Sequence, residues 1–104
     1  MKDRMTVRHG MLGDLQQYLE QSGWTIEEPV GEYEVLRARR AGYPRPLLVH
    51  NRKERGCGYS VDERDKKVYQ GWKRNRRRRG LDPDRPTAEE EARERWPMWR
   101  GEKP

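Results

Sequence analysis

The first regular pattern of apolar residues along the chain is helical. Between residues 11 and 21, apolar side chains recur at steps of three and four, which places them on one face of a helix. This stripe consists of Met11, Leu12, Leu15, Tyr18 and Leu19. A glycine just past the last periodic residue can take the left-handed conformation, so Gly23 is expected to end the helix, with Trp24 folding back on the final turn.

Three extended segments follow this helix. Residues 32–40 alternate between two sets of side chains, which favours a strand, and the segment 41–46 contains two prolines and a glycine and is expected to be a connection. Residues 47–49 form the only run of three aliphatic side chains and are predicted to be the central strand. After a charged turn at 51–56, residues 57–61 are predicted to form the third strand of an antiparallel sheet.

A second helix is predicted to begin after Asp62, which is a good N-cap residue. Acidic side chains in the first turn and basic ones from Lys73 onward match the helix macrodipole at both ends. Val68, Tyr69 and Trp72 supply the buried stripe of this helix. Gly71 is expected to weaken it by about 1 kcal/mol relative to alanine.

The composition of the chain changes after Gly80. Two prolines in residues 81–86 indicate a linker, and residues 87–90 form a capping-box pattern that predicts a short helix ending before Pro97. The elements therefore predict a single small α+β domain at residues 1–80, built from a helix, a three-stranded antiparallel sheet and a basic helix. Residues 81–104 are expected to be a Pro-containing linker and a short acidic helical tail.

Charge adds a candidate function to this fold. The chain has 24 Lys and Arg against 18 Asp and Glu, and residues 1–80 hold a net charge of +8. Six cations fall within residues 73–79, at the end of the predicted second helix: Lys73, Arg74, Arg76, Arg77, Arg78 and Arg79. Arginine matches phosphate oxygens with its planar fork, and each neutralised phosphate releases counterions. This run is therefore a candidate contact for RNA or DNA, the alternative being a solvated end of the helix.

A second set of side chains is expected to extend this surface across the sheet. Its members are Arg37, Arg39, Arg40, Tyr43, Arg52 and Lys53. Exposed aromatics between cations suit stacking on unpaired bases, which gives Tyr43 a possible binding role. The alternative is that this tyrosine only covers a core that is short of apolar residues, since Leu, Ile, Val and Phe together number 14.

Trp96 and Trp99 are unusual in a short tail that also contains prolines. Two such side chains either dock on the domain or serve as anchors of a protein interface. The second possibility gives an alternative function, in which the protein is an inhibitor or adaptor that binds a partner protein through this tail.

The sequence offers little that is typical of a catalytic or metal-binding site. His9, His50 and Cys57 form no zinc pattern, and the carboxylates show no spacing that marks a magnesium site. We therefore expect a protein that is not an enzyme and has no cofactor and no metal, with a metal-dependent nuclease as the least favoured alternative. The single cysteine and the charged residues after Met1 favour the cytoplasm over secretion or a membrane.

Two resemblances bear on these expectations. The element order, with residues 56–60 leading into a basic second helix, resembles a double-stranded-RNA-binding domain. In that family the second helix begins with a lysine-rich signature, whereas residues 62–67 here begin acidic, so no residue roles are carried over. A short charged chain without a catalytic motif also resembles in kind small phage or mobile-element proteins of the anti-CRISPR type. That resemblance, which matches no family motif, implies inhibition of a nucleoprotein machine by stoichiometric binding.

Overall fold

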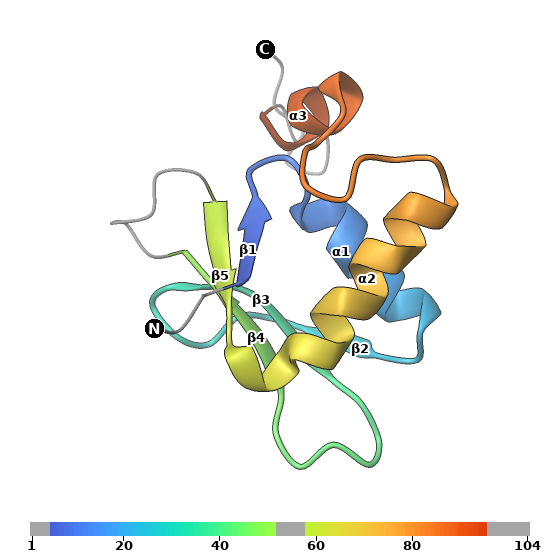
Figure 1. Ribbon diagram of the computed structural model, residues 1–104. Coiled ribbons are helices and arrows are strands. Elements are labelled where there is room, and N and C mark those ends of the chain that lie inside the picture. Colours follow the sequence, from blue (N-terminus) through green and yellow to red (C-terminus); the bar gives the residue numbers. More distant parts are fainter. Residues whose placement is uncertain (1–4, 52–57, 96–104) are drawn as a thin grey trace.

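The computed structural model describes residues 5–51 and 58–95 of the chain. A five-stranded antiparallel sheet is covered on one face by two helices, and a third helix lies at one end of the pair (Figure 1). The strands are β1 (Met5–Arg8), β2 (Thr25–Glu27), β3 (Glu34–Arg39), β4 (Leu47–His50) and β5 (Gly58–Val61). The helices are α1 (Leu12–Gln21), the 3₁₀ turn η1 (Glu63–Asp65), α2 (Lys66–Arg78) and α3 (Ala88–Arg95).

The predicted α+β class is confirmed, but the sheet has five strands where the sequence predicted three. The strand order is β1-β5-β4-β3-β2, so the three predicted strands form the centre and the two additional strands form the edges. Strand β1 has four residues and β2 has three, and of these seven residues only Val7 is fully buried. Segments this short give too few alternating positions to be recognised from the sequence.

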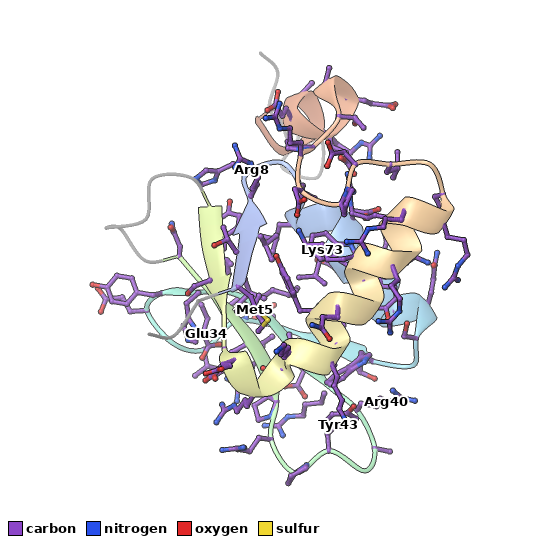
Figure 2. The ribbon with its side chains drawn as sticks, in the orientation of Figure 1. Met5, Arg8, Glu34, Arg40, Tyr43 and Lys73 are labelled. Atoms are coloured by element: carbon purple, nitrogen blue, oxygen red, sulfur yellow. The ribbon has the colours of Figure 1, made fainter. Side chains whose placement is uncertain are left out.

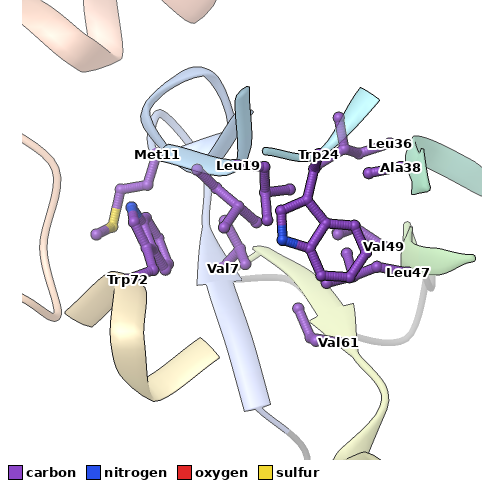
Figure 3. Packing of buried hydrophobic residues seen from close by; sticks show 11 residues of the cluster. Val7, Met11, Leu19, Trp24, Leu36, Ala38, Leu47, Val49, Val61 and Trp72 are labelled. Carbon is purple, nitrogen blue, oxygen red and sulfur yellow. The ribbon is translucent and has the colours of Figure 1, made fainter. Parts of the chain in front are cut away.

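The register of the strands brings the apolar side chains onto one face. Leu36 pairs with Val49, and Val49 pairs with Val61, so apolar residues from three strands lie in a row. Helices α1 and α2 close this face with further apolar side chains (Figure 3). The buried core consists of Val7, Met11, Leu15, Leu19, Trp24, Leu36, Ala38, Leu47, Val49, Val61 and Trp72.

The predicted end of α1 and the predicted start of α3 are confirmed at the level of single hydrogen bonds, whereas α2 begins at Lys66, after the 3₁₀ turn capped by Asp62, and not directly after Asp62. Gly23 has φ of +94°, and the N–H of Trp24 donates to the carbonyl of Leu19 at 2.9 Å. At the start of α3, the N–H of Glu90 donates to Thr87 Oγ1 at 3.0 Å while Glu90 Oε1 accepts from the N–H of Thr87 at 2.8 Å. The capping box therefore closes in both directions.

The glycine in the middle of α2 has a packing role that the sequence did not reveal. A Cβ atom at Gly71 would lie 2.5 Å from the hydroxyl oxygen of Tyr18 on α1. The absence of a side chain therefore makes room for this tyrosine at the contact between the two helices. The cost is the lower helix propensity of glycine.

Replacing Gly58 with alanine is expected to destabilise the fold by about 1–3 kcal/mol, because a Cβ atom there meets the backbone of β1. It would clash with the carbonyl oxygen of Val7 and lie 2.8 Å from the Cα of Arg8. Gly13 is the matched control, because a Cβ atom there has no neighbour within 4 Å and Gly13→Ala should be neutral or stabilising. Urea unfolding of both variants tests this, and equal stabilities would contradict it.

Candidate nucleic-acid interface

Helix α2 has a buried side and a solvent side. Val68, Trp72 and Arg76 face the sheet and α1, and the opposite side carries only polar and charged residues. With about 100° of rotation per residue, these polar residues fall within an arc of about 120° and extend over about 18 Å of helix. We call this set the outer face of α2: Lys66, Lys67, Gln70, Arg74, Arg77 and Arg78. All six residues are exposed.

The five cations of the outer face of α2 are not neutralised within the described part of the chain. No ion pair or side-chain hydrogen bond connects them to residues 5–51 or 58–95. Five positive side chains along one helix raise the local positive potential, because each adds to the field of the others. This is the arrangement that a row of phosphates would complement.

Arg76 lies on the other side of the same helix and corrects the prediction made for it. Its side chain is fully buried, and all five of its N–H donors are used. The guanidinium donates to Asp14 Oδ2 at 3.0 Å and to both carboxylate oxygens of Glu90 at 2.8 and 3.1 Å. The remaining two bonds go to the carbonyl oxygens of Asp82 and Arg85. No donor is left for a phosphate, so Arg76 belongs to the interior.

Lys73 is likewise removed from the candidate surface. Its side chain is 90% buried, with Nζ donating to the carbonyl of Pro83 and to Asp84 Oδ1 at 3.1 Å. The ammonium also lies 4.9 Å from the ring centroid of Tyr69 and 5.5 Å from that of Trp72. Figure 2 shows Lys73 beside the segment that follows α2.

Arg79 is intermediate between the exposed cations of the outer face of α2 and the buried pair Lys73 and Arg76. It remains 41% exposed, but it donates to Asp14 Oδ2 at 2.8 Å and to Asn75 Oδ1 at 2.8 Å. Its charge is therefore partly compensated, and we do not count it among the cations of the outer face of α2.

The predicted sheet arginines are paired with carboxylates. Arg37 contacts Glu34 at 3.1 Å and Glu27 at 3.4 Å, and Arg39 contacts Glu27 at 3.0 Å. Hydrogen bonds from the N–H of Val30 and from Arg37 hold the pKa of Glu34 below its usual range despite desolvation. These arginines are committed to a local charge network and do not continue the outer face of α2.

The loop between β3 and β4 carries the predicted pair Arg40 and Tyr43 (Figure 2). The tyrosine is 45% exposed, and its ring lies 4.8 Å from the ring of the buried Trp24. The guanidinium carbon of Arg40 lies 5.9 Å from the Tyr43 ring centroid. Tyr43 therefore covers part of the core, as in the alternative interpretation, and remains partly exposed.

Other predicted residues lie outside the described part of the chain, namely Arg52, Lys53, Trp96 and Trp99. The sequence analysis did not include Lys66 and Lys67 among the candidates, because the acidic residues just before them argue against phosphate contacts at the start of this helix. Their spacing of seven and eleven residues from Arg74, Arg77 and Arg78 is the signal that could have placed them on the same face.

The segment after α2 is attached to the rest of the fold. The carbonyls of Asp82 and Arg85 and the carboxylate of Glu90 all bind the buried Arg76. A Cβ atom at Gly10, just before α1, would lie 3.1 Å from side-chain atoms of both Pro86 and Glu91. The predicted linker and the beginning of the tail thus pack against the helices.

The carboxylate of Asp14 on α1, which accepts hydrogen bonds from α2, should make the stability of the fold depend on pH. Burial alone would raise its pKa, but hydrogen bonds from Arg79, Trp72 and Arg76 outweigh this and lower the pKa. A lowered pKa in the folded state stabilises the fold above the usual aspartate pKa, and this stabilisation is lost as the pH falls below about 4. Asp14→Asn should cost roughly 1–2 kcal/mol at pH 7 and flatten the stability loss between pH 5 and 3. Equal acid sensitivity of the two proteins in urea unfolding would contradict this.

Within residues 5–51 and 58–95, no group of three or more His, Cys, Asp or Glu is placed to hold a metal ion. None of the helices in this part of the chain is long and apolar enough to cross a membrane. Comparisons with protein-family models, curated proteins and solved structures give no match.

Proposed function

We propose that this protein is a non-catalytic, cytoplasmic nucleic-acid-binding protein that contacts phosphates through the outer face of α2. The observation that carries the proposal is the contrast between two groups of cations. Arg37, Arg39, Lys73 and Arg76 are paired with acidic groups, whereas the five cations of the outer face of α2 are exposed and without acidic partners in the described chain.

A phosphate backbone fits this surface for two reasons. Its charges lie along a line, as do the five cations of this helix face, and three of the five side chains are arginines that can bind phosphate through two nitrogens. The bound nucleic acid can be free or part of a larger complex, and in the second case binding would block or recruit that complex. This retains the inhibitor role expected from the sequence as one form of the same activity.

A titration of the purified protein against fluorescent single-stranded RNA, duplex RNA and duplex DNA tests the proposal. At least one of them should bind, and its affinity should fall about 10²- to 10³-fold between 50 and 200 mM salt if the five cations contact phosphates. Absence of binding to all three, or binding that does not depend on salt, would overturn the proposal. The partner would then be sought among proteins.

A further inference from the structure

The middle of the outer face of α2 differs in chemistry from its two ends. Gln70 and Arg74 are exposed and four residues apart, so their side chains are neighbours one helical turn from each other. Lys66 and Lys67 precede them, and Arg77 and Arg78 follow. The neutral amide therefore lies within a row of cations.

This order corresponds to the two kinds of contact that duplex DNA offers. Glutamine and arginine can form paired hydrogen bonds with the major-groove edges of adenine and guanine, respectively. Lysines and arginines at the ends suit the phosphates that fix a helix in its register. Gln70 and Arg74 thus have the chemistry for base edges, and the four flanking cations have the chemistry for the backbone.

The dimensions of the helix favour B-form DNA over duplex RNA. The cations at the two ends are separated by about 16 Å along the helix axis. The major groove of B-DNA is about 12 Å wide and admits an α-helix, so phosphates of both strands can lie near the two ends. The major groove of A-form RNA is too deep and narrow for side chains to read.

The inner side of α2 is held firmly enough to present this face without rearrangement. Trp72 Nε1 donates to Asp14 Oδ2 at 2.9 Å, and the Tyr69 hydroxyl donates to the carbonyl of Thr6 at 2.8 Å. The buried Arg76 adds its five bonds near the C-terminal end. A helix fixed in this way loses little conformational freedom on binding.

We propose, building on the nucleic-acid-binding function above, that α2 enters the major groove of B-form duplex DNA and that Gln70 and Arg74 recognise base edges. The protein then prefers particular DNA sequences. The acidic Asp62 and Glu63, about one turn before Lys66, mark the end of the segment that contacts phosphates.

The preferred sequence is obtained by selection from a random duplex DNA library with the wild-type protein. Anisotropy titrations then compare the selected duplex with a scrambled duplex, the RNA duplex of the same sequence and its single DNA strand. The selected DNA duplex should bind on the order of 10- to 100-fold more tightly than the scrambled one, since each paired base contact discriminates by about this factor. It should also bind more tightly than the RNA duplex and the single strand.

Two variants that keep the net charge separate base reading from phosphate attraction. Gln70→Ala removes an uncharged amide, and Arg74→Lys keeps the charge but loses the paired donors. Each should abolish most of the sequence preference while affinity for the scrambled duplex changes by about twofold or less. Arg77→Lys is the matched control at a phosphate-contacting position and should retain the preference.

Three results would overturn this inference while leaving nucleic-acid binding intact: no sequence is enriched, RNA or single-stranded DNA binds as tightly as the selected duplex, or both variants keep the wild-type preference. Failure to bind any nucleic acid would instead remove the proposed function as well. The outcomes of the two proposals are therefore distinguishable in one set of titrations.

Discussion

Replacing Arg76 with methionine is expected to lower the free energy of unfolding by about 3–5 kcal/mol, although the new side chain is apolar and close in length. The substitution leaves the carboxylates of Asp14 and Glu90, which are almost inaccessible to solvent, without their shared cation. It also removes the donors that satisfy the carbonyls of Asp82 and Arg85. The cost is that of uncompensated buried polar groups, because the methionine itself fits an apolar interior.

Two companion variants separate this explanation from a general effect of removing charge. Arg79→Met removes a half-exposed arginine that also contacts Asp14, but Asp14 keeps its bonds from Trp72 and Arg76, so the expected loss is at most about 1 kcal/mol. Adding Asp14→Asn and Glu90→Gln to Arg76→Met neutralises both carboxylates that Arg76 contacts and should restore part of the lost stability. Urea unfolding monitored by tryptophan fluorescence measures all of them. Equal losses for Arg76→Met and Arg79→Met would contradict the buried network.

Neutralising the C-terminal half of the outer face of α2 is expected to weaken nucleic-acid binding by about 10²-fold near physiological salt. The variant carries glutamine at Arg74, Arg77 and Arg78, which are exposed and make no ion pair in the described chain. Because no folded-state bond is broken, its stability should stay within about 0.5 kcal/mol of the wild type. A loss of affinity can then be assigned to the interface.

A charge-matched control distinguishes this local effect from the overall positive charge of the protein. Glutamine at Arg8, Arg85 and Arg93 removes the same three charges from exposed positions on β1, the segment after α2, and α3. Long-range attraction falls equally in both variants, but only the first loses phosphate contacts. The control should bind within about fivefold of the wild type.

The sequence predicted the elements whose signals are local. The stripe of α1, the glycine that ends it and the capping box of α3 each depend on residues within one or two helical turns, and the structure confirms all three. Strands β1 and β2 are different, because they owe their conformation to pairing with β5 and β3, far away in the sequence. A strand of three or four residues without such a partner has no stable pattern of its own.

The division of the arginine run could not be predicted from its composition. Lys73 and Arg76 follow Tyr69 and Trp72 at helical spacing, so the phase of the helix already directed them inward. Burying an arginine is nevertheless unfavourable unless carboxylates meet it. The two that do come from positions 62 residues before and 14 residues after Arg76, which only the folded structure brings together.

The most direct test of the proposed function is the salt dependence of nucleic-acid affinity for three proteins: the wild type, the Arg74, Arg77 and Arg78 variant, and the charge-matched control. The slope of log affinity against log salt reports the number of phosphate contacts, so it should become shallower by about 2 to 3 in the first variant and remain unchanged in the control. If both variants alter the slope and the affinity equally, the outer face of α2 is not the interface.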